Sequence, residues 1–351
     1  MSAEKKNHLI MVDVIKGICI IMVILTHVTT IPNDTRKLIL YPFTILPAVP
    51  IFLMLSGFTF SMAEMSKADN KSSYDIAQWF DKNRFFSRFK RFFIPYLIAD
   101  LSILLFLILL CNVRRFSFST LWKIFIFGGR GPGGYYVILL MEFLVLFPFL
   151  LYGINKSPFL FSMFIVCFYI AYETLCRYVW NLEEAVYNRL VFHYILHILL
   201  GLLLYKYKEK ITNSAIPLIS LVIGIIYIIN VYYWGYKPLL GMDAGSRKSF
   251  GILFSFGLIC YLLQLEPWAK KYSVLLKPIS YIGKASYHIL LAQMVFFYFA
   301  RYFHVEDMIG YLPVIIVFDL VMGLTSGCLF YAVDTEVRNW IALSRKMSEK
   351  H

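Results

Sequence analysis

Three polar side chains interrupt an apolar stretch near the N-terminus, residues 12–28, whose sequence is VDVIKGICIIMVILTHV. A helix advances 100° and 1.5 Å per residue, so Lys16 and His27 lie within about 20° of one face and about 16 Å apart. Asp13 lies one turn before Lys16 on the same side. We expect this polar stripe to face the inside of a helix bundle, because a charge that faces lipid costs several kcal/mol.

The stripe could support acid–base or acyl-transfer chemistry. Imidazole is the usual general base near neutral pH, so His27 is a candidate base or carrier of an acyl group. Asp13 and Lys16 can pair and would organise the entrance to the site. The alternative interpretation is structural: Asp13 and Lys16 anchor the helix end, and His27 forms a hydrogen bond between helices.

A second group of candidates lies in the segment DKNRFFSRFKRFFIPYL, residues 81–97. Arg84, Arg88 and Arg91 recur at intervals of four and three residues, which places them on one helical face. Guanidinium groups bind phosphates through two parallel hydrogen bonds, so this face predicts a clamp for a phosphorylated donor. The alternative is a basic anchor at the start of a membrane span.

Other polar residues lie within apolar stretches. Glu142 follows a Gly/Pro-rich loop by two helical turns, and an intramembrane carboxylate is a functional candidate. Tyr136 lies at the edge of the same loop. Late in the chain, Ser286, Tyr287 and Gln293 could contact an acyl acceptor or form hydrogen bonds between helices.

Metal chemistry has little support in the sequence. His193 and His197 have the i, i+4 spacing of metal ligands, but no third ligand is evident nearby, which favours packing. The six cysteines form no CxxC pair. We therefore predict no metal and no bound cofactor.

The composition shows what kind of elements must position these residues. Hydrophobic residues make up 60% of the 351 residues and charged residues only 16%. Such a chain is typical of a polytopic membrane protein, and only helices or closed barrels satisfy the backbone in lipid. We predict an all-α integral membrane fold with about ten transmembrane helices in one bundle and a single domain, 1–351. The expected spans are 10–31, 40–63, 92–112, 135–153, 158–175, 190–207, 215–234, 249–265, 281–303 and 312–332.

The basic residues predict the orientation of this bundle. The formal net charge is +13, and lysines and arginines are more numerous in the loops on the side of the termini. Both termini are therefore expected to be cytoplasmic, with basic side chains at anionic lipid headgroups. No nucleic-acid-binding motif is present, so the positive charge does not predict a nucleic-acid partner.

Several motifs, in this order, resemble the membrane-bound acyltransferase-3 family. The first is KGICIIMVILTH, from Lys16 to His27, in which lysine replaces the arginine common in the family. VPIFLMLSGF resembles the signature second span, and RFKR resembles the Arg-x-x-Arg motif of the family's cytoplasmic loop. In GGYYVILLMEFLVLFP, Tyr135, Tyr136 and Val137 replace Trp-Phe/Tyr-Leu. IGKASYHILLAQM is similar to the late Gly-Lys-x-Ser-Tyr span, with Gln293 where many members have histidine.

The resemblance implies a function for the candidate residues. The donor would be cytoplasmic acetyl-CoA, or another acyl-CoA such as succinyl-CoA. The acceptor would be a hydroxyl of a cell-surface polysaccharide or of its lipid-linked precursor. The protein would be a bacterial O-acetyltransferase in the plasma membrane. Arg88 and Arg91, with Arg84, would hold the coenzyme A phosphates. His27 would act on the acceptor hydroxyl, and Glu142 or Tyr136 would orient the imidazole or the acceptor.

The alternative function is export of a polysaccharide or of a lipid-linked glycan unit. Intramembrane charges also serve transporters. Many transporters contain inverted repeats, and no internal repeat is evident in this sequence, which favours the enzyme.

Overall fold

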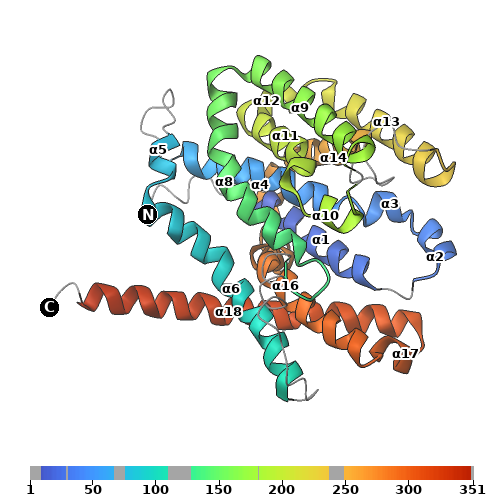
Figure 1. Cartoon of the computed structure of the whole chain (residues 1–351), viewed down its shortest axis with the longest axis vertical. Coiled ribbons are helices and arrows are strands. Elements are labelled where there is room, and N and C mark those ends of the chain that lie inside the picture. The colour runs from blue at the N-terminus through green and yellow to red at the C-terminus, as the bar shows by residue number, and fades with distance from the viewer. Residues whose placement is uncertain are drawn as a thin grey trace.

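The protein is described by a computed structural model over residues 9–28, 31–66, 76–109, 128–180, 182–236 and 249–348. Every regular element in this part of the chain is a helix (Figure 1). In chain order the helices are α1 (Ile10–His27), α2 (Asn33–Leu38), α3 (Tyr41–Thr44), α4 (Ala48–Met65), α5 (Ile76–Trp79), α6 (Lys82–Leu109), α8 (Tyr135–Lys156), α9 (Pro158–Tyr178), α10 (Glu184–Tyr187), η2 (Val191–Tyr194), α11 (Ile195–Lys206), α12 (Lys208–Thr212), α13 (Ile216–Ile228), η3 (Ile229–Tyr233), η4 (Ser249–Gly251), α14 (Ile252–Gln264), α15 (Glu266–Lys271), α16 (Lys277–Tyr302), α17 (Val305–Ile309) and α18 (Leu312–Ser348).

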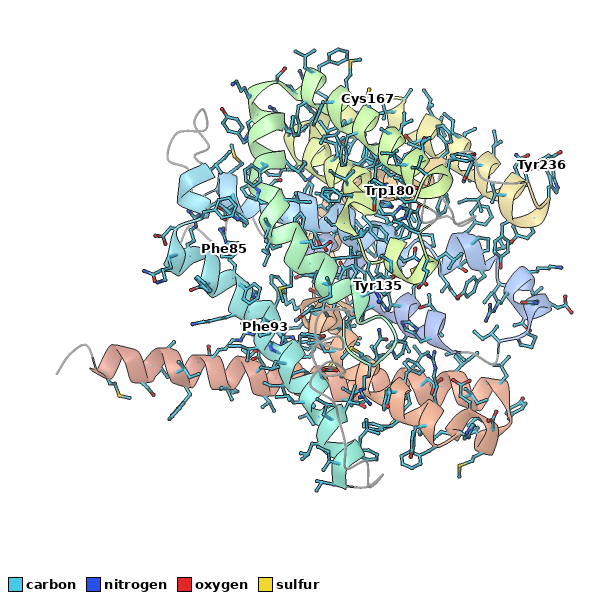
Figure 2. The ribbon with its side chains drawn as sticks, in the orientation of Figure 1. Phe85, Phe93, Tyr135, Cys167, Trp180 and Tyr236 are labelled. Carbon is cyan, nitrogen blue, oxygen red and sulfur yellow. The ribbon has the colours of Figure 1, made fainter. Side chains whose placement is uncertain are left out.

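The helices are apolar and long enough for a membrane. Seven stretches of the described chain could cross it by length and composition, namely Ile10–His27, Tyr41–Met65, Lys82–Leu109, Tyr135–Lys156, Pro158–Cys176, Ile216–Tyr233 and Leu312–Ser344. Large apolar side chains of α9 face outward: Phe159, Leu160 and Phe164 are 73%, 67% and 62% exposed. Figure 2 shows Cys167 on the same helix, and this cysteine is also exposed. Such a surface suits lipid, and the fold is the predicted all-α integral membrane fold.

Each of the ten predicted spans coincides with a helix or a pair of consecutive helices, although the number of helices that cross the membrane stays a prediction. Two boundaries differ clearly from those expected. Helix α6 begins at Lys82 rather than at residue 92, and α18 continues to Ser348 rather than ending at 332. The expected ends were set by apolarity, whereas a helix continues into polar sequence that contains no glycine or proline. At 37 residues, α18 is about 55 Å long and extends past the rest of the bundle (Figure 1).

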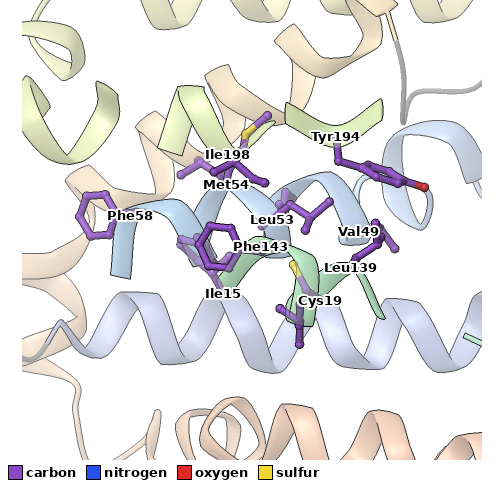
Figure 3. Close-up of a cluster of buried hydrophobic side chains, with 14 of the residues drawn as sticks. Ile15, Cys19, Val49, Leu53, Met54, Phe58, Leu139, Phe143, Tyr194 and Ile198 are labelled. Carbon is purple, nitrogen blue, oxygen red and sulfur yellow. The ribbon is translucent and has the colours of Figure 1, made fainter. Parts of the chain in front are cut away.

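The core lies where α1, α4, α8 and α11 meet. Figure 3 shows side chains of these helices pointing into one shared space, among them Ile15, Leu53, Phe143 and Ile198. Ile15 is 1% exposed, and the other three are fully buried. This packing fixes the rotation of α1, so that its polar residues lie on an adjacent face, about 100° around the helix from Ile15.

Helix α16 packs directly against α1 through glycines. A Cβ atom at Gly283 would lie 1.8 Å from the carbonyl oxygen of Asp13, and one at Gly17 would lie 2.3 Å from that of Ile279. Small residues allow this close approach of two membrane helices. The two helices run in the same direction, because Asp13 lies beside Ser280 and the last residue of α1, His27, lies beside Phe297.

Candidate functional site

A cavity of about 640 Å³ runs through the bundle and collects most of the candidate residues. Its walls come from α1, α4, α6, α8, α16 and α18 and from the loop that precedes α8. The lining residues include Asp13, Lys16, Ile20, Val23, His27, Phe52, Ser56, Thr59, Glu64, Arg88, Arg91, Gly133, Tyr136, Lys284, Ser286, Tyr287, His288 and Tyr331. We call the end lined by Glu64, Arg88 and Arg91 the arginine end, and the end lined by His27 the histidine end.

One face of α1 forms a continuous wall of this cavity. Asp13, Lys16, Ile20, Val23 and His27 follow one another at intervals of three or four residues, and all five line it. The helix rises about 21 Å from Asp13 to His27. The polar stripe therefore follows the length of the cavity and is turned away from lipid.

Asp13 is buried, and its neighbours belong to α16. Its Oδ2 lies 3.8 Å from the Lys284 ammonium and accepts a 3.5 Å hydrogen bond from the Ser280 hydroxyl. Both contacts cross the close α1–α16 interface, so they add polar interactions to the glycine packing there. A partly buried carboxylate next to an ammonium group is stabilised by this proximity.

His27 is the last residue of α1 and lies at the histidine end. Its ring lies 5.7 Å from the ring of Phe297, and its backbone carbonyl accepts a 3.2 Å hydrogen bond from Arg301. The C-terminal end of a helix carries partial negative charge, which stabilises a nearby cation. The Arg301 guanidinium lies in this field and fixes the end of α1 that carries His27.

The glycine-rich loop before α8 covers the imidazole. Gly133 has a φ of +84°, and a Cβ atom at this position would lie 3.3 Å from Nε2 of His27. Glycine therefore serves both the left-handed backbone and the close approach. Helix α8 begins directly after this loop at Tyr135, which Figure 2 labels, and the next residue, Tyr136, lines the cavity beside Phe52.

At the arginine end, a carboxylate already engages two of the three arginines. Glu64 Oε2 lies 2.8 Å from Arg84, and Glu64 Oε1 pairs with Arg88. The Arg88 guanidinium also lies 3.6 Å from the centre of the Trp79 ring, a cation–π contact that further fixes its position. Arg88 and Arg91 line the cavity, whereas Arg84 does not.

Glu64 is a site residue that the sequence analysis missed. It is 7% exposed and lies at the end of α4. The available signal was that it is the sole acidic residue in residues 41–65, directly before a basic segment. Its pairing with Arg84 and Arg88 depends on tertiary structure.

The late candidates of α16 are divided between the cavity and the core. Ser286 and Tyr287 line the cavity, and the Tyr287 hydroxyl donates a 2.6 Å hydrogen bond to the carbonyl of Phe92. Gln293 is fully buried outside the cavity lining, and its amide atoms have no hydrogen-bond partner among the described residues. His288, the next residue of the same motif, lines the cavity, and its Nε2 lies 2.9 Å from Oδ2 of Asp334.

Glu142 is not brought together with His27. Its Oε2 accepts a 2.8 Å hydrogen bond from the backbone N–H of Val191, and the residue is not part of the cavity lining. Val191 opens η2, so Glu142 satisfies one of the free N–H groups at a helix start. This contact connects α8 to the segment before α11.

The two histidines at metal-ligand spacing serve other contacts. His193 Nδ1 lies 2.5 Å from Glu173, which also accepts a hydrogen bond from Tyr187. Both His193 and His197 are fully buried. Within the described ranges, no group of three histidine, cysteine or acidic residues is arranged to hold a metal ion.

Comparison with known families identifies the chain. The model of the acyltransferase-3 family, an acyltransferase domain, matches residues 10–332. This chain belongs to the acyltransferase-3 family. No curated protein and no solved structure shows significant similarity to it.

The match extends from the first residue of α1 into α18, so every wall of the cavity belongs to the acyltransferase-3 domain. Combined with the apolar helices, it identifies the protein as a membrane acyltransferase. Residues from four of the family-like motifs contribute to the cavity, namely the α1 stripe, Arg88 and Arg91 of α6, the tyrosines of α8 and the Ser-Tyr pair of α16.

Proposed function

We propose that this acyltransferase moves an acetyl or similar acyl group from cytoplasmic acyl-CoA to a hydroxyl of a cell-surface polysaccharide or its lipid-linked precursor. The enzyme would be a multi-pass protein of a bacterial plasma membrane, with anionic lipids at its basic loops. The observation that carries the proposal is that one and the same cavity has arginines at one end and an imidazole at the other.

The arginine end suits the phosphates of the donor. Arg88 is held by Glu64 and Trp79, and Arg91 lies about one turn further along the same helix and also lines the cavity. Guanidinium groups that are fixed before binding lose less conformational entropy when they bind a phosphate. The acyl arm would extend from here along α1.

The histidine end suits the chemical step. His27 accepts the proton of the acceptor hydroxyl, and the hydroxyl oxygen attacks the thioester carbonyl carbon. The carbon–sulfur bond then breaks, and the coenzyme A thiolate takes the proton from the imidazolium. The products are the O-acyl sugar and the free thiol, so the step needs no further reactant.

The length of the cavity accounts for the polar residues within the first span. Donor and acceptor would reach the site from opposite sides of the membrane, and the α1 stripe lines about 21 Å between the two ends. Lys16 and Asp13, with Lys284 beside Asp13, provide charged groups in the part nearest the arginine end.

Acyl transfer by the purified protein tests the proposal. The enzyme in lipid vesicles is given radiolabelled acetyl-CoA or succinyl-CoA together with surface glycan extracted from its host. We expect label in the glycan and release of free coenzyme A thiol in equal amounts, both dependent on the glycan. Glycan movement across the vesicle without any label transfer would contradict the proposal and support an exporter.

A further inference from the structure

The middle part of the cavity, between Arg91 and His27, contains a second imidazole with a fixed orientation. Nε2 of His288 lies 2.9 Å from Oδ2 of Asp334. The same carboxylate oxygen lies 2.8 Å from Nε of Arg338, and Arg338 donates a 3.1 Å hydrogen bond to the carbonyl of Arg91. This chain connects α16, α18 and α6.

The hydrogen-bonding role of His288 follows from these contacts. Arg338 already balances the charge of Asp334, which favours a neutral imidazole. The carboxylate accepts the N–H of Nε2, so Nδ1 carries a lone pair and can only accept a hydrogen bond. Nδ1 is buried and has no partner among the described residues, although His288 itself lines the cavity. A buried polar atom without a partner is unfavourable by about 1–3 kcal/mol and is typically satisfied by a ligand or water.

Three hydroxyl groups of the cavity lining also donate their hydrogens within the protein. Ser56 donates to the carbonyl of Phe52 at 2.8 Å, and Thr59 donates to that of Leu55 at 2.7 Å. Tyr287 donates to the carbonyl of Phe92 at 2.6 Å. All three residues line the cavity, and their hydrogens are used within the protein. Ser56 also interacts with the Tyr136 hydroxyl, so the oxygens of Thr59 and Tyr287 are the ones that offer lone pairs to a ligand. Next to the Lys16 ammonium, the middle part of the cavity therefore also presents hydrogen-bond acceptors.

The position of His288 along α16 places it on the path of an extended donor. It lies four residues after Lys284, which is beside Asp13, and nine residues before Phe297, which is beside His27. These intervals correspond to about 6 Å and about 13 Å along the helix. A donor with phosphates on Arg88 and Arg91 and its acyl group at His27 must pass His288.

We propose that His288, oriented by Asp334, binds the pantetheine arm of the acyl donor by accepting a hydrogen bond from its hydroxyl or amide N–H groups. This inference rests on the proposed acyl-CoA donor and specifies how the arm is recognised. Pantetheine carries hydroxyl and amide hydrogens between a phosphate and a thioester, which complements a cavity with cations at one end and hydrogen-bond acceptors in the middle.

Binding of two probes to the full-length protein in nanodiscs tests the inference. Coenzyme A carries the arm, whereas adenosine 3′,5′-bisphosphate carries phosphates without it. For His288→Leu we expect the Kd of coenzyme A to rise about tenfold, the loss of roughly one hydrogen bond, and the Kd of the bisphosphate to stay within about twofold. His288→Asn retains a hydrogen-bonding group and should preserve most of the coenzyme A affinity.

The matched control is His304→Asn, which changes an exposed histidine outside the cavity. It should leave both affinities unchanged. Equal losses for both probes in His288→Leu, or an unchanged Kd for coenzyme A, would overturn the role of His288. If the wild-type protein binds the bisphosphate but gains nothing from the arm, the inference is likewise wrong. If wild type binds neither probe, the proposed donor itself is wrong.

Discussion

At the scale of single residues, the site depends on how closely the glycine-rich loop approaches His27. A Cβ atom at Gly133 would lie 3.3 Å from Nε2 of the imidazole, and the positive φ of this glycine excludes most side chains without strain. The loop therefore limits where the ring can lie. A substitution here changes the position of the imidazole without removing it.

Gly133→Ala should reduce acyl transfer at least tenfold, because the added methyl group strains the backbone and displaces the ring. The matched control is Gly235→Ala. Gly235 has a φ of +73°, but beyond its chain neighbours no atom of the described residues lies within 4 Å of the position its Cβ would take. Both variants carry similar backbone strain, about 1–2 kcal/mol, and only the first touches the site. Transfer rates at matched protein levels compare them, and equal activity of the two variants would show that the loop does not position His27.

Residue identity and spacing were sufficient to find one wall of the site. Asp13, Lys16 and His27 share a helix, so the period of 3.6 residues alone places them on one face. Glu64 with Arg88, and His288 with Asp334, could not be paired in this way. Their partners lie 24 and 46 residues away on other helices, and no periodicity states which helices become neighbours.

Glu142 is a residue for which the sequence suggested a partner that the structure does not place beside it. An acid within a span is expected to have a functional partner, and the expected partner was His27 or an acyl acceptor. The structure gives it a backbone N–H at the start of η2 instead. Sequence cannot distinguish a carboxylate that orients a reactive group from one that satisfies a helix end.

At the scale of elements, helix α6 has a basic first part that lines the cavity and an apolar later part that packs in the bundle. Its first turns carry the arginines, and its later part is apolar and packs with α16 through Phe106 and Phe299. The helix runs without a break from Lys82 to Leu109, with Pro95 between its basic and apolar parts, so the helical face predicted for the arginines is continuous with the membrane segment.

Arg91→Ala should weaken coenzyme A binding at least tenfold, because a charge-assisted hydrogen bond to phosphate is lost. Lys90→Ala is the control on the same helix. It removes the same charge from an exposed neighbour that does not line the cavity, so its affinity should stay within about twofold. Isothermal titration of both variants measures the difference. If both lose affinity equally, the effect reflects the general positive charge and not a clamp.

The predicted spans agree with the helices because long apolar runs determine both. Disagreement is confined to their ends, at Lys82 and Ser348, where helical propensity continues beyond the apolar sequence. Short breaks, such as the change from η2 to α11 at Ile195, were also not predicted. They depend on contacts such as that between Glu142 and Val191.

At the scale of the whole molecule, one cavity connects the two ends of the bundle. The account requires the arginine end to open to the cytoplasm and the histidine end to the other side. The distribution of basic residues predicts this orientation. The side from which each end of the cavity can be reached by a reagent measures it.

Cysteine labelling from each side tests the orientation, in a chain whose six native cysteines are replaced by alanine. Ala63 lies beside Glu64, and Thr26 lies beside His27; both line the cavity. An impermeant thiol reagent should label Ala63→Cys only in inside-out vesicles and Thr26→Cys only in intact cells. Coenzyme A should protect Ala63→Cys. Labelling of both positions from one side would contradict an arginine end and a histidine end that open on opposite sides of the membrane.

The central claim is acyl transfer to a surface glycan through His27, and the most direct measurement is the acyl content of those glycans. A deletion strain is complemented with wild type, with His27→Ala or with the control His304→Asn, at equal amounts of membrane-inserted protein. The account predicts that wild type and the control restore O-acyl groups, whereas His27→Ala restores less than about one hundredth, the range expected for loss of a general base. Full restoration by His27→Ala would contradict it.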